Sequence, residues 1–62
     1  MDNGLYNLMT QLTHEQRSLW RIEKHYLEEA DNEEERIFWK NLAEDMRNHI
    51  KDLKELIKTN IS

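Results

Sequence analysis

LEEADNEEERI, residues 27–37, is the stretch that decides the fold, because the hydrophobic pattern of the chain breaks there. On either side of it, apolar residues recur at alternating steps of three and four. They are Leu5, Leu8, Leu12, Leu19, Ile22 and Tyr26 before it, and Trp39, Leu42, Met46, Leu53 and Leu56 after it. This spacing is typical of helices that pack along a seam. The sequence therefore predicts two helices, with a turn at residues 31 and 32.

The acidic residues of this stretch indicate where the second helix begins. Glu33, Glu34 and Glu35 favour the first turn of a helix, where carboxylates stabilise free N–H groups, and Asp31 or Asn32 can cap it. Thr13 begins a second capping pattern, Thr-His-Glu-Gln, that could start the first helix late. A late start would leave half of the second helix unpaired. We therefore predict an antiparallel two-helix hairpin, with helices over residues 4–30 and 33–60.

Composition supports an all-α single domain over residues 1–62. The chain has no Pro, no Cys and one Gly, so it lacks the residues of tight turns and disulfides. Its net charge of −4 disfavours nucleic acid as a partner. Neither a membrane span nor a signal peptide is recognisable, so we expect a cytoplasmic protein. A chain this short buries too little apolar surface to be comfortably stable without disulfides, a metal or a partner chain, so we weigh a metal or association from the start.

Two polar residues fall inside the predicted seam. With Leu5 at position a of a heptad, Glu15 and Glu29 take d in the first helix, and His49 takes d in the second. A turn at residues 31 and 32 places Glu15 opposite His49. Because a buried carboxylate or imidazole is costly without a partner, we expect the two to pair in one buried polar layer.

The apolar surface is wider than one seam. Further apolar residues flank both stripes: Tyr6, Trp20, Leu27, Phe38, Ala43, Ile50 and Ile57. One partner helix cannot cover all of them. The sequence therefore predicts a homo-oligomer, in which two hairpins form a four-helix bundle whose twofold axis lies near the polar layer.

The second helix also carries a resemblance to a known family. Residues 38–50, FWKNLAEDMRNHI, follow a Glu inside the first helix and an acidic turn, a layout that looks like half of a ferritin-like bundle, as in rubrerythrins and encapsulated ferritins. The resemblance implies metal ligands at Glu15 and His49. Met46 stands where that family's Glu-x-x-His motif has its Glu, so Asp45 is the candidate substitute. Two copies would supply two Glu and two His side chains, which are enough ligands for one zinc ion but a small set for two iron ions.

Three functions remain as hypotheses. The first is a self-associating hairpin with a structural or protein-interaction role, and the second is a minimal ferritin-like protein that binds iron or zinc. A weaker one is a Rop-like RNA-binding hairpin dimer that uses the basic residues of the second helix, Lys40, Arg47, Lys51, Lys54 and Lys58. No nucleophile arrangement or phosphate loop is present in the sequence, so any enzyme activity would be ferroxidase-like.

Overall fold

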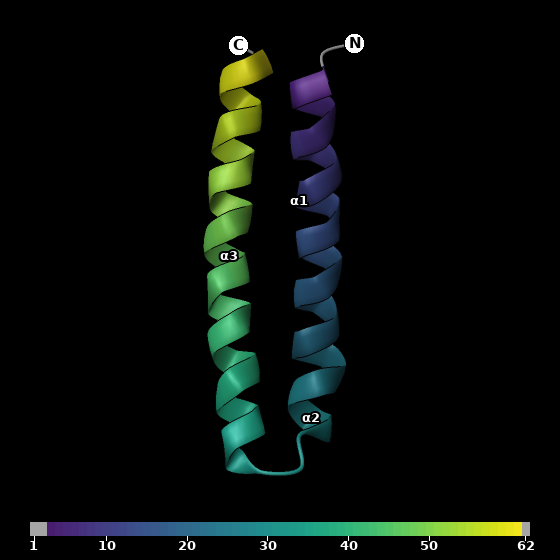
Figure 1. Ribbon diagram of the computed structural model, residues 1–62, viewed down its shortest axis with the longest axis vertical. Helices are drawn as coiled ribbons and strands as arrows, with labels where there is room; N and C mark the ends of the chain where they lie inside the picture. The colour runs from purple at the N-terminus through teal and green to yellow at the C-terminus, as the bar shows by residue number, and fades with distance from the viewer. Residues whose placement is uncertain (1–2, 62) are drawn as a thin grey trace.

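The computed structural model describes the backbone of residues 3–61 and the side chains of residues 3–60. The chain forms two helical rods (Figure 1). The first runs without a break through α1 (Asn3–Arg21), the π-helix η1 (Ile22–Tyr26) and α2 (Leu27–Glu29), and the second is α3 (Glu33–Ile61). Between residues 3 and 61 there is no strand, so the all-α prediction is confirmed.

The connection between the rods is short and is fixed by a side-chain cap. Ala30 is extended, with φ −62° and ψ 129°, and ends the first rod. The Asn32 side-chain oxygen accepts a hydrogen bond from the backbone N–H of Glu35 at 2.9 Å, and its amide donates to the Glu35 carboxylate at 3.1 Å. Of the two predicted caps, Asn32 is therefore the one used, as an N-cap whose side chain holds both the N–H and the carboxylate of Glu35.

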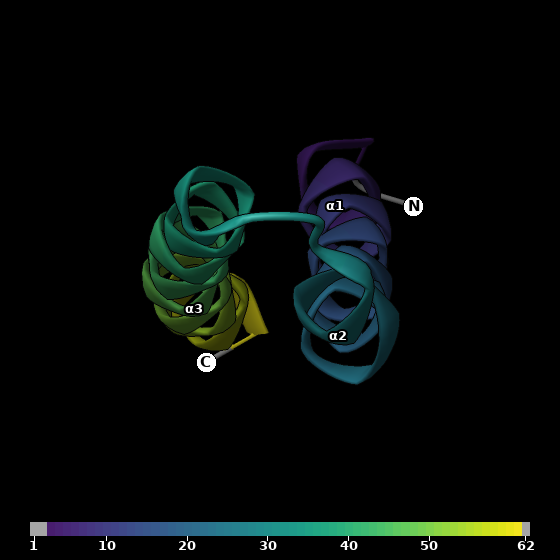
Figure 2. The same ribbon diagram turned by 90° about the horizontal axis from the view of Figure 1, so that it is seen from below.

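The two rods lie side by side and run in opposite directions, with the turn at one end and both termini at the other (Figures 1 and 2). Near the turn, the rings of Tyr26 and Trp39 are 4.9 Å apart, and farther along Glu15 contacts His49. α1 passes through Thr13 without a break, and the Thr13 hydroxyl donates to the Met9 carbonyl at 3.1 Å. The first helix therefore does not start late at Thr13, as the hairpin prediction requires.

The π-helix η1 changes the register of the first rod. Its wide turn, in which the Leu27 N–H bonds to the Ile22 carbonyl, inserts one extra residue into the helical repeat. The heptad prediction of Glu29 as a seam residue is therefore wrong, whereas Tyr26, which is 37% exposed, still contacts Trp39 at the edge of the seam. Leu27 and Ala30 are half-buried instead, and Glu29 is exposed. The shift avoids burying an unpaired carboxylate and turns a leucine inward.

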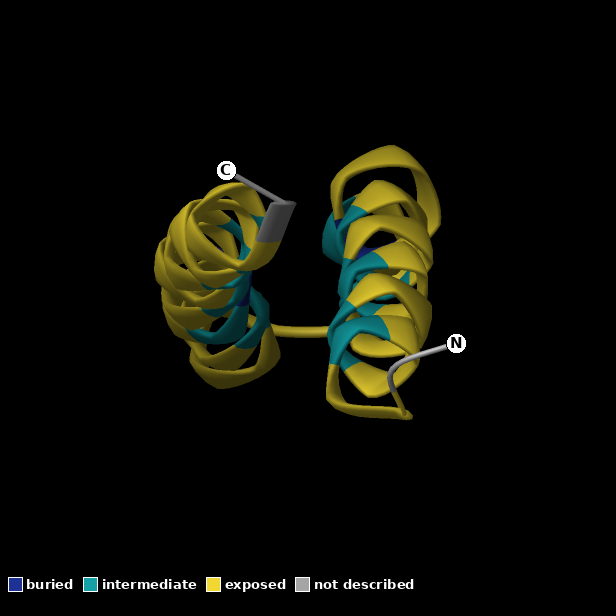
Figure 3. Cartoon of the chain, turned by 90° about the horizontal axis from the view of Figure 1, so that it is seen from above, coloured by how far each residue is buried: buried dark blue, intermediate teal, exposed yellow. Residues whose placement is uncertain are grey.

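The seam of α3 is rotated slightly from the prediction: Trp39, Met46 and Leu53 are half-buried as predicted, but two of the predicted d positions are not. Ala43 is buried and Ile50 and Ile57 are half-buried, whereas His49 and Leu56, predicted at d positions, are exposed. The rotation keeps the imidazole hydrated and places aliphatic side chains inside. Half-buried and buried positions of the two rods face each other in Figure 3.

A single chain buries little of its apolar surface. Only Ile22 and Ala43 are buried among residues 3–60, each 2% exposed. The radius of gyration is 14.1 Å, against about 11 Å for a compact chain of this length. The accessible surface is 5010 Å², whereas a compact monomer of 7.6 kDa exposes about 4,300 Å². No helix within residues 3–61 is long and apolar enough to cross a membrane.

Candidate functional site

Glu15 and His49 form the central polar contact between the rods. The Glu15 Oε1 atom lies 2.7 Å from the His49 Nδ1 atom. An ionised carboxylate can only accept a hydrogen bond, so the ring N–H donates. The predicted pairing is therefore confirmed. The predicted burial of both partners is wrong in part, because the Glu15 side chain is 14% exposed but that of His49 is 59% exposed.

The local structure explains why Glu15 tolerates its position. Glu15 projects from the seam of α1 between the half-buried Leu12 and Leu19. Its carboxylate reaches the rim of α3, where His49 supplies a donor and water has access. No buried side-chain polar atom among the described residues lacks a hydrogen-bond partner. The contact thus satisfies a half-buried carboxylate without creating a dry polar core.

Two hollows lie between the rods around this contact, and together their linings form what we call the groove face. One, of about 360 Å³, is lined by Gln11, Glu15, His49, Asp52, Leu53 and Leu56. The other, of about 180 Å³, is lined by Ser18, Arg21, Ile22, Tyr26, Trp39, Leu42 and Met46. Most of the α3 side chains in both linings are apolar. The groove face is therefore apolar mainly on its α3 side, whereas α1 adds polar residues, and the Glu15–His49 contact lies near its middle.

The predicted metal ligands are only partly brought together. Asp52, rather than Asp45, shares a hollow with Glu15 and His49, and Asp45 is exposed on α3. No group of three His, Asp or Glu side chains with metal-binding geometry occurs among the described residues. One chain thus offers a single close carboxylate and imidazole pair, whereas zinc sites use three or four protein ligands, so one chain alone does not complete such a site. The metal role of these residues stays a prediction.

The basic residues of α3 lie on a mixed-charge surface. Arg47 forms an ion pair across the rods with Glu23, and both side chains are about half exposed. Lys40, Lys51 and Lys54 are exposed along the same helix, interspersed with Asp and Glu. This is the pattern of a solvated helix face rather than of a continuous phosphate-binding strip.

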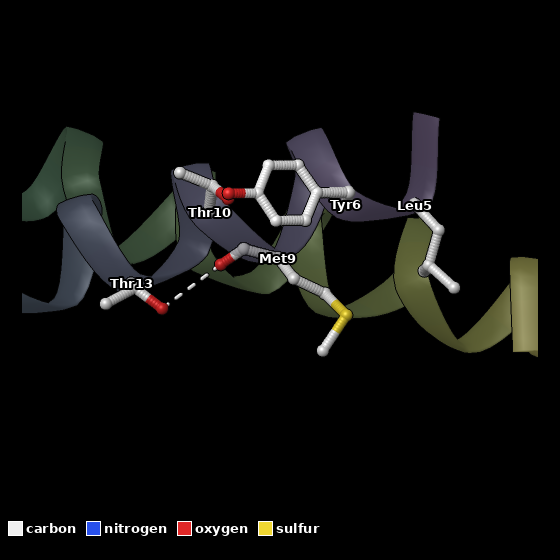
Figure 4. Close-up of a pocket in the computed structure, with 5 residues that line it drawn as sticks. All are labelled: Leu5, Tyr6, Met9, Thr10 and Thr13. Atoms are coloured by element: carbon white, nitrogen blue, oxygen red, sulfur yellow. Dashed lines mark hydrogen bonds between the residues drawn. The ribbon is translucent and has the colours of Figure 1, made fainter. Parts of the chain in front are cut away.

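A third hollow lies on α1 alone, and the predicted site did not include it. It has a volume of about 300 Å³ and is lined by Leu5, Tyr6, Met9, Thr10 and Thr13 (Figure 4). The signal for it was in the sequence. Tyr6, Met9, Thr13, Gln16 and Trp20 repeat the alternating three and four spacing a second time on α1.

Comparisons with protein families, with characterised proteins and with solved structures found no match to this chain. The chain is an all-helical protein whose groove face is apolar mainly on its α3 side. The ferritin-like resemblance stays a prediction.

Proposed function

We propose that the chain is an antiparallel helical hairpin whose function is to self-associate, as a structural or protein-interaction module. Two copies pack groove face to groove face into a four-helix bundle. The observation that carries this proposal is the accessible surface of 5010 Å², which exceeds that of a compact monomer by about 700 Å². A stable interface of standard size removes about 800 Å² from each partner, so one such contact would hide the excess.

The exposed apolar side chains beside the groove support the same arrangement. Leu56 lines the groove and is 51% exposed, and Phe38, which is 57% exposed, lies five turns away at the same helical angle of α3. Leu42, which also lines the groove, lies on α3 between the angle shared by Phe38 and Leu56 and the seam. Large apolar side chains left exposed toward both ends of the groove are costly in water and are the kind of surface that a partner helix covers.

The polar contact would then fix the register of the bundle. Glu15 and His49 stand near the middle of their rods, and both line the groove. A twofold axis close to them would place two such pairs in one layer. A buried polar pair in an apolar interface disfavours shifted registers, because a shift separates the partners and leaves each unpaired.

Sedimentation equilibrium tests the proposal. The parent chain should sediment as at least two copies at micromolar concentration, and Leu56→Lys should shift the distribution toward smaller species. Ile37→Lys is the matched control, because Ile37 is 49% exposed on the same helix but lies about 100° around it from Leu56. A parent chain that sediments as a folded monomer, or an equal effect of both substitutions, would overturn the proposal.

Metal binding between two copies is a second candidate function. The observation in its favour is that Glu15 and His49 both line the groove that the second copy would cover, so two copies would bring two carboxylates and two imidazoles together. Elemental analysis of protein purified without chelators tests it, with Glu15→Ala and His49→Ala as comparisons. Iron or zinc that is absent from the parent, or equal in all three proteins, would end it.

The cytoplasmic location and the Rop-like RNA-binding function stay predictions of the sequence.

A further inference from the structure

A stripe of uncharged residues, with large apolar side chains at both ends, runs along the outer side of α1. It consists of Tyr6, Met9, Thr13, Gln16 and Trp20, which we call the outer stripe, and all five side chains are exposed. The stripe contains no charged residue, in a chain in which 35% of residues are charged. Its steps of three and four are those of a helix-packing seam. Because α1 is also straight and unbroken there, the stripe has the pattern of a second contact surface.

The outer stripe lies away from the groove face. At 100° per residue, its centre is about 170° around α1 from Gln11 and Ser18, which line the groove. A partner that covers the groove face therefore leaves the outer stripe in water. Tyr6, Met9 and Trp20 would remain 57%, 51% and 54% exposed, so a groove-to-groove dimer does not complete the burial of large apolar side chains.

The hollow on the outer stripe has the layout of a packing hole. Four of its lining residues, Tyr6, Met9, Thr10 and Thr13, have the i, i+3, i+4 and i+7 spacing of the four residues that surround a knob from a facing helix. Its volume of about 300 Å³ corresponds to roughly ten water molecules, which gives room for a large aromatic ring. The Thr13 hydroxyl is bonded to the Met9 carbonyl, so it needs no water at that surface (Figure 4).

Trp20 is the matching knob on the same stripe. Its ring is 54% exposed and stands edge to face against His25 at 5.2 Å between centroids. It lies about three turns along α1 from the centre of the hollow, or roughly 15 Å. Because knob and hole stand on one straight helix, an antiparallel copy of α1 brings each Trp20 onto the hollow of the other chain at the same time.

We propose that a second copy of this chain binds along the outer stripe, with the Trp20 of each copy in the hollow of the other. The twofold axis of this contact lies near residues 14 and 15, which places Thr13 opposite Gln16 of the other copy. Such a contact is isologous, since the same surface serves on both sides. The interface is separate from the groove interface of the proposed bundle. Where both form, the assembly contains more than two chains.

Sedimentation equilibrium of surface variants tests this interface. Trp20→Lys and Met9→Lys remove the knob and one wall of the hole, and each should reduce the mass of the parent assembly to two chains. The substituted side chains are more than half exposed, so the helices should form as before, which circular dichroism verifies. Ile37→Lys, at a residue of similar exposure on α3, should leave the mass unchanged.

The two interfaces fail in distinguishable ways. If Leu56→Lys alone yields a dimer and its combination with Trp20→Lys yields a monomer, both interfaces stand. A parent dimer that Leu56→Lys dissociates and Trp20→Lys does not would overturn the outer-stripe contact and leave the bundle intact. A parent dimer with the opposite response would overturn the bundle and support the outer-stripe contact. A monomeric parent would overturn both.

Tryptophan fluorescence gives a direct readout of the knob. In Trp39→Phe protein, Trp20 is the remaining tryptophan of the chain. Its emission should shift to shorter wavelength as the protein is concentrated and the ring leaves water. The shift should be lost when Met9→Lys is added. Emission that stays at the wavelength of exposed indole while the sedimenting mass rises would contradict the contact.

Discussion

The half of the molecule next to the turn and the half next to the termini are built from similar helices but are held together differently. The turn half contains both buried residues, Ile22 and Ala43, the ring contact of Tyr26 with Trp39, and the Asn32 cap. In the terminal half, the described residues include no fully buried side chain, and leucines and isoleucines are half-buried at best. The turn half is thus the more self-sufficient of the two.

This difference indicates where a partner matters. In the turn half, the seam of one chain is enough to bury Ile22 and Ala43 almost completely. In the terminal half, Leu8 and Leu53 are half-buried and Leu56 is about half exposed. A second chain is therefore needed to bury them further. We therefore expect core substitutions near the turn to act within one chain and substitutions near the termini to act through association.

The largest expected effect is that of Ile22→Ala. Ile22 is 2% exposed, so the substitution leaves a cavity and should lower the free energy of unfolding by about 2–5 kcal/mol. Leu8→Ala, at a half-buried position of the terminal half, should cost less than half as much in dilute protein. Urea unfolding at one fixed protein concentration measures both. Equal costs would show that the two halves do not differ.

The Asn32 cap should have an intermediate effect. Asn32→Ala removes the acceptor for the Glu35 N–H at 2.9 Å and should cost about 1 kcal/mol. Asn41→Ala is the matched control, because Asn41 is an exposed interior position of α3, where alanine favours the helix by a few tenths of a kcal/mol. If the two substitutions change the urea midpoint in the same direction, the cap does not stabilise the turn half.

The Glu15–His49 contact, which joins the two rods where the two halves meet, should have a smaller effect. His49→Ala leaves Glu15 without its partner, but the site is open to water on the His49 side, so we expect a loss of about 0.5–1 kcal/mol. A double-mutant cycle with Glu15→Ala isolates the pair. A coupling energy of zero, measured by urea unfolding, would mean that the contact does not help to align the rods.

The exposed ion pair should have the smallest effect. Arg47→Ala removes the partner of Glu23, and both side chains are well exposed, so the loss should be a few tenths of a kcal/mol and should vanish in high salt. Thermal melts at low and high salt measure it. If Arg47→Ala lowers the stability more than Asn32→Ala does, the expected order of effects is wrong.

Much of the backbone could be predicted from the sequence, because local signals are strong. The acidic stretch and Asn32 mark the turn, and the three and four spacing marks both rods within one residue of their ends. The Glu15–His49 contact followed from the same register. Hydrophobic period and capping chemistry act over a few residues and so can be read directly from one chain.

The side-chain burial was harder to predict, because it depends on small rotations. Two stripes of α3, one through Leu42, His49 and Leu56 and one through Ala43, Ile50 and Ile57, are both largely apolar. Burying the first stripe would remove the His49 imidazole from water, so burying the second stripe costs less free energy. The sequence signal for the π-helix was weaker. It was that the heptad pattern places Glu29 in the seam and leaves the nearby Leu27 outside it. The metal role of Glu15, Asp45 and His49 depends on a second chain, which one sequence does not describe.

The central claim, that the chain folds as an assembly of copies, is tested most directly by the concentration dependence of its thermal melt. Circular dichroism melts at two protein concentrations that differ a hundredfold should give midpoints that differ on the order of 10 °C, with the concentrated sample melting later. Leu56→Lys should reduce that difference. A midpoint that is the same at both concentrations would show a chain that folds alone and would contradict the account.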